Sequence, residues 1–371
     1  MGDAIVGVVA NPLSGRDIRR LVTQATVFPT AEKASMICRM LAAFGALGVH
    51  RALLSTDLGG ISAGVYRALK RRRPGDPPWP EVEFLDGSPI TQTAHDTTAA
   101  TARMVSGGAR VIVCLGGDGT ARVTAKAVGD VPMLAVSTGT NNAFPVVREA
   151  TIAGLAAALV ATRAVPREDA LRRAKILEVR AGDRAEAALV DVAVSTQRHV
   201  AARAVWDPAT LTQLFCAFAE PDAIGLSSIL GQAAPCSRTD PYGVMTDLTL
   251  NSGGTFLSPI APGLLAPVGI GEVRRLEPGT WHPVTTRAGV LAIDGERELT
   301  FDPGTHPEVR LRTDGPWCVD VPATLAASAR LGLLQCLPGG HSASRGNHPP
   351  TPGSLPPEAD QPRNQRGGAH G

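Results

Sequence analysis

The chain has 371 residues, a formal charge of +2 at pH 7 and 44% hydrophobic residues. This length accommodates two domains, and the balance of 36 basic and 34 acidic residues gives no reason to expect a nucleic-acid partner or an anionic membrane. No segment has the features of a signal peptide, and no apolar run reaches the ~18 residues of a membrane span. The six cysteines are scattered without a Cys-x-x-Cys pair, so we expect a cytoplasmic protein with reduced thiols.

The first 150 residues alternate between apolar, β-branched runs and segments with helical periodicity. This alternation predicts a doubly wound, Rossmann-like parallel sheet. The expected strands are 5–10, 50–54, 81–85, 110–115 and 132–136, and the expected helices are 31–45, 62–72, 97–105, 121–128 and 151–164.

The pattern changes after residue 174, where short alternating or apolar runs are separated by Gly, Pro, Asp and Ser. This spacing predicts a mostly β domain with sandwich or Greek-key packing, with strands at 175–179, 187–194, 246–250, 289–293 and 298–301. Residues 201–219 are interpreted as an inserted helical stretch. Residues 338–371 are rich in Pro, Gly, Ser, His and Arg, and we expect them to be disordered.

Three polar loops follow predicted strands, and the most informative is Gly116-Gly117-Asp118-Gly119-Thr120. Glycines at the carboxyl edge of a parallel sheet let the backbone approach a phosphate, and their N–H groups can form an anion-binding nest. A glycine-rich strand-to-helix turn without a ligand is the competing interpretation. The other two loops are Asn11-Pro12-Leu13-Ser14-Gly15 and Thr138-Gly139-Thr140-Asn141-Asn142, where helix capping competes with nucleotide contact.

Together, the three loops resemble the superfamily of NAD kinases, diacylglycerol kinases and sphingosine kinases. Within it, the chain is most similar to the ATP-NAD kinase-like proteins that include the acetoin-catabolism protein X group. The resemblance implies an α/β nucleotide-binding domain at 1–150 and a mostly β acceptor-side domain at 151–302. It also implies that 303–337 returns to the first domain, ahead of the tail at 338–371.

The resemblance also implies site roles, for phosphoryl transfer from ATP with Mg²⁺ to a hydroxyl of NAD or a related small molecule. Asp118 is expected to orient or deprotonate the acceptor hydroxyl, and Glu296 to be a second cleft carboxylate. Asp294-Gly295 alone is a strong hairpin-turn signal, and both interpretations are compatible. Asp191 is a candidate on the acceptor side. The expected nucleotide-binding residues are Asn11, Gly116, Gly117, Gly119, Thr120, Thr138, Thr140, Asn141 and Asn142.

The sequence departs from both kinase branches. The Glu-Val-Asn pattern of lipid kinases is replaced by Arg122-Val123-Thr124 after Ala121, and the Gly-Ser-Thr-Ala-Tyr run of NAD kinases is not found. A lipid or sphingoid kinase, and a nucleotide-binding accessory protein of acetoin catabolism without turnover, therefore remain alternatives. Arg203 is interpreted as a solvated surface residue. A homo-oligomer is expected by analogy, with no membrane and no nucleic-acid partner.

Overall fold

The computed structural model describes residues 3–14, 23–85, 89–198, 203–249 and 254–335. Residues up to Leu333 belong to one compact unit, and the residues from Leu334 onward are a second. The predicted disorder of 338–371 falls outside the described residues. The cysteines within the described ranges are free thiols.

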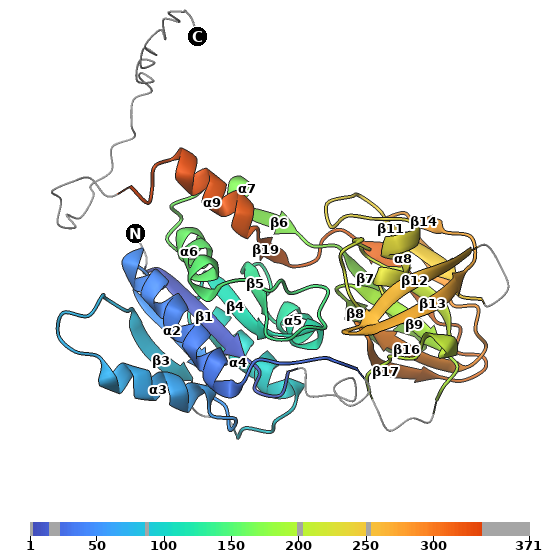
Figure 1. The fold of residues 1–371 in the computed structure, drawn as a ribbon, viewed down its shortest axis with the longest axis horizontal. Coiled ribbons are helices and arrows are strands. Elements are labelled where there is room, and N and C mark those ends of the chain that lie inside the picture. Colours follow the sequence, from blue (N-terminus) through green and yellow to red (C-terminus); the bar gives the residue numbers. More distant parts are fainter. Residues whose placement is uncertain (1–2, 15–22, 86–88, 199–202, 250–253, 336–371) are drawn as a thin grey trace, which may run out of the picture. The chain divides into compact units, whose positions relative to one another are not determined.

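A seven-stranded sheet forms the centre of the first part of the chain (Figure 1). Its order is β3-β2-β1-β4-β5-β19-β6, and neighbours pair in parallel except β19 with β6. β1 and β4 are buried along their whole length, which explains their continuous apolar sequences. The strands are β1 (Ile5–Ala10), β2 (Arg51–Ser55), β3 (Glu81–Leu85), β4 (Val111–Gly116), β5 (Met133–Ser137), β6 (Leu171–Arg173) and β19 (Trp317–Val319).

Helices cover both faces of this sheet. One buried cluster joins the strands to α2, α3, α6, α7 and α9, and another joins them to α4 and α5 on the opposite face. Strand order reverses between β1 and β4, the position at which open parallel sheets bind ligands. The helices are α2 (Thr30–Ala46), α3 (Ile61–Arg71), α4 (Ala94–Ser106), α5 (Asp118–Ala125), α6 (Ala150–Ala161), α7 (Arg167–Ala170) and α9 (Val321–Arg330).

The second part of the chain consists mainly of antiparallel strands. A six-stranded sheet (β14-β11-β10-β9-β16-β17) and a four-stranded sheet (β15-β18-β7-β8) share one buried core, and β12 and β13 form a separate hairpin. The predicted class, a parallel α/β sheet followed by a β-sandwich, is therefore confirmed. The elements are β7 (Ile176–Ala181), β8 (Arg184–Ala188), β9 (Asp191–Ser195), η1 (Pro208–Thr210), β10 (Leu211–Cys216), α8 (Ser228–Ala233), β11 (Gly243–Asp247), β12 (Gly254–Ala261), β13 (Leu264–Ile270), β14 (Arg274–Leu276), β15 (Trp281–Pro283), β16 (Gly289–Ile293), β17 (Glu296–Phe301) and β18 (Glu308–Arg312).

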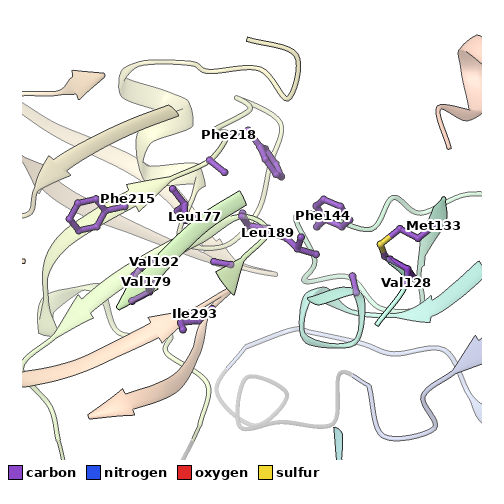
Figure 2. Close-up of a cluster of buried hydrophobic side chains, with 14 of the residues drawn as sticks. Val128, Met133, Phe144, Leu177, Val179, Leu189, Val192, Phe215, Phe218 and Ile293 are labelled. Carbon is purple, nitrogen blue, oxygen red and sulfur yellow. The ribbon is translucent and has the colours of Figure 1, made fainter. Parts of the chain in front are cut away.

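A single apolar core continues from the parallel sheet into the β-sandwich (Figure 2). Met133 of β5, Phe144 beyond it, and Leu189 and Phe218 of the β part belong to this cluster. The Arg238 guanidinium reinforces the junction, because it donates to the carbonyl oxygen of Phe144 at 2.9 Å and lies 4.2 Å from the Phe218 ring. The junction is therefore packed like a protein interior.

Four predicted elements are wrong in extent or type. The strand expected at 246–250 is β11 at Gly243–Asp247. Helix α5 begins at Asp118 instead of residue 121, because Gly117 is extended and the next three residues already turn as a helix. The described part of 201–219 holds η1 and β10 instead of a helix, because Leu211–Cys216 pairs with β9 and β11 in the six-stranded sheet. The predicted strand 187–194 is two strands, β8 and β9, separated at Leu189 and Val190.

Candidate active site

A cavity of about 1000 Å³ lies at the carboxyl ends of β1 and β4, where the strand order reverses. Its walls come from both the parallel sheet and the β part, and it is large enough for two small ligands. The sequence-predicted residues that line it are Asn11, Gly117, Asp118, Gly119, Thr120, Thr140, Asn141, Asn142 and Glu296.

Three predicted residues do not line the cavity. Gly116 is the last residue of β4, Thr138 is 1% exposed, and Asp191 is 4% exposed. Thr138 connects the loops after β1 and β5, because its hydroxyl lies 3.0 Å from that of Ser14. These three residues therefore do not face the cavity.

Each glycine of the loop after β4 lets another side chain pack closely against the backbone. A Cβ on Gly116 would lie 2.5 Å from the Thr120 side chain, and one on Gly117 would lie 2.6 Å from Asn142 Oδ1. A Cβ on Gly119 would lie 3.2 Å from Glu296 Oε1. The sequence Gly-Gly-Asp-Gly therefore permits tight packing as well as an open backbone at the N-terminus of α5.

The Asp118 carboxylate is fixed by the backbone. It accepts hydrogen bonds from Ala143 N at 3.1 Å and from Phe144 N at 2.8 Å. As the first residue of α5, it also lies at the positive end of the helix dipole. The loop after β4 and the loop after β5 are joined through this side chain.

The loop after β1 is joined to the other two by side chains. The Asn11 amide donates to Thr120 Oγ1 at 3.1 Å, and Asn11 Oδ1 accepts from Leu13 N at 2.8 Å. Lys33 of α2 is 1% exposed and donates to Asn11 O and to Ser14 Oγ, both at 3.0 Å. The polar side chains around the loop after β1 thus bond largely to one another.

The predicted Asp294-Gly295 turn connects β16 to β17. Both residues have positive φ, 49° and 75°, as a two-residue type I′ hairpin requires. The Asp294 carboxylate is buried and accepts hydrogen bonds from Leu189 N at 3.0 Å and from Val190 N at 2.8 Å. These bonds explain the break between β8 and β9, and the turn leaves Glu296 beside the cavity.

Arg122 of α5 connects the two walls electrostatically. It is 5% exposed, donates to Glu298 at 2.6 Å, and lies 3.6 Å from Asp294 and 4.0 Å from Glu296. Arg203 pairs with Glu298 at 2.6 Å and lines the cavity, and its side chain is 67% exposed, as expected for a solvated surface residue. The sequence offered one signal for Arg122, which is four residues after Asp118 and therefore on the same face of α5.

The buried carboxyl groups next to this cluster have perturbed protonation. Burial raises the pKa of Asp294 to about 7, the Arg122 guanidinium opposes that rise, and the charge of Asp118 adds to it. Burial, with the charges of Asp294 and Asp118, raises the pKa of Asp191 well above its usual range. Three carboxyl groups therefore influence one another at the end of the cavity nearest the β part.

Both parts of the chain match known protein families. Residues 6–164 match the ATP-NAD kinase N-terminal domain, and residues 175–314 match the acetoin catabolism protein X C-terminal domain. The first part of the chain is therefore of the ATP-NAD kinase type, and the resemblance inferred from the three loops is confirmed.

The chain is 40% identical over 341 residues to acetoin catabolism protein X of Cupriavidus necator, a match covering 90% of this chain and 95% of the relative. The chain belongs to the acetoin catabolism protein X family. Among solved structures, yeast NADH kinase complexed with NADH gives a TM-score of 0.46 at 13% identity, over 93% of this chain and 91% of that chain. This likeness is too distant to transfer a ligand contact.

Among the described residues, no helix is long and apolar enough to span a membrane. The same residues contain no group of three or more His, Cys, Asp or Glu side chains arranged to hold a metal ion. Mg²⁺ is commonly held by one or two carboxylates together with substrate phosphates, and Asp118 and Glu296 offer hard oxygen donors of that kind. The donor set therefore fits Mg²⁺ that arrives with a nucleotide.

Proposed function

We propose that the protein transfers the terminal phosphoryl group of ATP to a hydroxyl group of a small molecule bound in the same cavity. The observation that carries this proposal is the meeting of the glycine loop, Asp118 and Glu296 in one cavity of about 1000 Å³. Phosphoryl transfer depends mainly on positioning and charge neutralisation, which such a cavity can supply.

The nucleotide phosphates are assigned to the wall formed by the parallel sheet. The first N–H groups of a helix have no partner inside the helix, and those of α5 follow Gly117 at the edge of the cavity. Gly117, Gly119 and Thr120 supply these donors, while Asn141 and Asn142 lie beside them on the same cavity. Asn11, Thr138 and Thr140 act by holding the loops together.

Asp118 is assigned to the acceptor hydroxyl. Its two backbone hydrogen bonds fix the orientation of the carboxylate, and it lines the cavity between the glycine loop and Glu296. A carboxylate in this position can accept the hydroxyl proton as the new P–O bond forms. A fixed base of this kind typically contributes 10²–10⁴ in rate, roughly 3–5 kcal/mol.

A divalent cation is expected with the nucleotide. On the wall shared by α5 and the β part, five carboxyl groups outnumber three cationic side chains, so phosphates that approach this wall meet excess negative charge. The groups are Asp118, Glu186, Asp294, Glu296 and Glu298 against Arg122, Lys126 and Arg203. When bound, Mg²⁺ supplies neutralisation of the phosphate charge, with Asp118 and Glu296 as its protein donors.

NAD is the first acceptor to test, because the N-terminal match is to the ATP-NAD kinase domain. The name of the C. necator relative points instead to a metabolite of acetoin catabolism as the acceptor, or to a nucleotide-binding accessory role without turnover. A lipid or sphingoid acceptor stays third, because Arg122 stands where that branch has its Glu-Val-Asn pattern.

The test is phosphate transfer from ATP-Mg²⁺ to NAD by the purified protein, with Asp118→Asn as the variant. We expect NADP formation to fall at least ~100-fold in the variant, while circular dichroism and ATP affinity stay close to those of the wild type. An Asn side chain keeps an oxygen for the bonds from Ala143 and Phe144 but cannot accept a proton.

Full activity of Asp118→Asn would refute the assignment of the base. If the wild type binds ATP but makes no NADP, the same assay with acetoin-derived hydroxyl compounds distinguishes another acceptor from an accessory role. Absence of ATP binding would refute the nucleotide site itself.

A further inference from the structure

Arg238 lies in the loop between α8 and β11, in the β part of the chain, and its guanidinium reaches the loop after β5. It donates hydrogen bonds to the carbonyl oxygen of Ala143 and, at 2.9 Å, to that of Phe144. The guanidinium also lies 4.2 Å from the Phe218 ring and 5.6 Å from the Phe144 ring, two of the side chains at the junction (Figure 2). One cation of the β part therefore holds two consecutive carbonyl groups of the loop after β5.

The same two residues of the loop after β5 also hold Asp118. Its carboxylate accepts hydrogen bonds from Ala143 N at 3.1 Å and from Phe144 N at 2.8 Å. The carbonyl group of Ala143 and the N–H group of Phe144 belong to one peptide group, so Arg238 bonds to one end of this peptide and Asp118 to the other. A cation at the oxygen and an anion at the N–H polarise a peptide in the same direction, and each hydrogen bond strengthens the other.

The orientation of the guanidinium is fixed by a third contact. Glu220 accepts a hydrogen bond from Arg238 Nε at 3.1 Å, and the two terminal nitrogens donate to the two carbonyl oxygens. All three nitrogens of the guanidinium are thus engaged. The planar fork of an arginine suits such a set of acceptors, which the single ammonium group of a lysine does not match.

The loop that carries Arg238 is itself tied to the β part. Lys175 is 5% exposed and donates to Ser237 O at 2.9 Å and to Tyr242 O at 2.6 Å, on either side of Arg238 in the sequence. The Asp240 carboxylate accepts a hydrogen bond from Ser237 N at 2.7 Å. Because its loop is held on both sides, Arg238 can fix the position of another group.

We propose that Arg238 is a positioning residue for Asp118, whose carboxylate it orients toward the acceptor hydroxyl through the peptide group between Ala143 and Phe144. This inference rests on the proposed function, in which Asp118 is the base. Arg238 does not line the cavity, so its effect on the reaction passes through Asp118. The β part then contributes to the reaction in two ways, because it supplies one wall of the cavity and orients a base that belongs to α5.

The competing role for Arg238 is that of a brace between the two parts of the chain. The junction is packed with apolar side chains, and the guanidinium adds to that packing. A brace would lower the stability of the protein by the same amount whichever residue stands at position 118. A positioning residue acts through the charge of Asp118, so its effect depends on that residue.

The first experiment measures phosphate transfer from ATP-Mg²⁺ by Arg238→Met, a change that keeps an apolar stem and removes the charge and the donors. We expect kcat to fall at least ~10-fold, because a misplaced catalytic group can lose ~100-fold in rate. The dissociation constant for ATP-Mg²⁺, measured by calorimetry, should stay at the wild-type value. In the Asp118→Asn background, Arg238→Met should lower kcat no further, because the base is already absent.

The matched control is Arg275→Met. Arg275 is an exposed arginine of the β part that lies 4.2 Å from the Tyr242 ring, and within the described chain no hydrogen bond joins it to the loop after β5. This variant should keep the wild-type kcat. An equal fall in kcat for Arg238→Met and the control, or an equal effect of Arg238→Met with and without Asp118, would overturn the proposal.

The second experiment needs no turnover. The loss in thermal midpoint caused by Arg238→Met should be smaller in the Asp118→Asn background than in the wild type, because a neutral amide polarises the shared peptide less. Equal losses in the two backgrounds would make Arg238 a brace only.

The proposed function and this inference can therefore fail separately. A wild type that binds ATP but phosphorylates no acceptor contradicts the proposed function, and the thermal comparison still decides whether Arg238 and Asp118 are coupled. If Arg238→Met does not fold, Glu220→Gln applies the same comparisons, because it weakens the contact that orients the guanidinium and leaves Arg238 in place. It should lower kcat in the same direction and by a smaller factor.

Discussion

The two walls of the cavity differ in the side chains that they present. Apart from Asp118, the loops after β1, β4 and β5 line the cavity with neutral residues, and Asn11 and Thr120 bond to one another. The wall from the β part presents Glu186, Glu296 and Glu298. In the proposed function, the first wall holds the nucleotide phosphates and the second sets the local charge. The three predictions below test this division.

The largest structural effect is expected from Arg122→Met. Removing this cation leaves the buried Asp294 carboxyl without a cationic partner and leaves Glu298 only the exposed Arg203, and breaking a buried pair typically costs about 3–5 kcal/mol of unfolding free energy. Urea denaturation measures the loss. Lys126→Met is the control, because Lys126 is 41% exposed and pairs only at the surface with Glu186, so it should lose less than about 1 kcal/mol. Equal losses would show that Arg122 does not join the walls.

A smaller effect is expected in the pH dependence of stability when Asp294 is replaced by Asn. The folded-state pKa of about 7 lies above the ordinary 3.8, so between these values the folded protein binds more protons than the unfolded chain. The contribution of Asp294 is therefore full below about pH 4 and is lost as pH rises through 7. Three pKa units correspond to at most about 4 kcal/mol.

Thermal unfolding from pH 4 to pH 8 checks this prediction. Relative to the wild type, Asp294→Asn should gain stability as pH rises through this window. Asp130→Asn is the control, because the Asp130 side chain is 92% exposed, and it should follow the wild-type curve. A constant difference between Asp294→Asn and the wild type across the window would contradict the raised pKa.

The smallest effect concerns the wall from the parallel sheet. Asn11→Ala removes the donor to Thr120 Oγ1 and the acceptor for Leu13 N, and should cost about 1 kcal/mol of stability. A double-mutant cycle with Thr120→Ala should give a coupling energy of at least ~0.5 kcal/mol. If the stability losses of the two single variants simply add in the double variant, other contacts hold the two loops together.

The sequence predicted well what depends on short-range pattern. β1 and β4 are buried on both faces, so their apolar runs identified them, and the Asp294-Gly295 dipeptide predicted its own turn because only such residues adopt two positive φ values. The break between β8 and β9 was not predictable, because it depends on Asp294, more than a hundred residues further along the chain.

The residues of the candidate site also differ in whether the sequence alone could predict them. The loops that line the cavity could be found from their glycines and their places after strands. The charges of the other wall could not, because Arg122 and Arg203 acquire their roles from Glu296 and Glu298 on a strand that is remote in sequence. The roles assigned to the individual site residues remain predictions until the substitutions are made.

The position of β19 has a consequence for how the protein is made. β19 (Trp317–Val319) lies between β5 and β6 in the first sheet, and α9 after it packs on α6 and α7. On the ribosome, the nascent chain therefore carries an incomplete first sheet while the whole β part is being synthesised. The edge of β5 stays open until residues 317–319 emerge, so a truncation that removes them should yield a chain prone to aggregate rather than a shorter folded one.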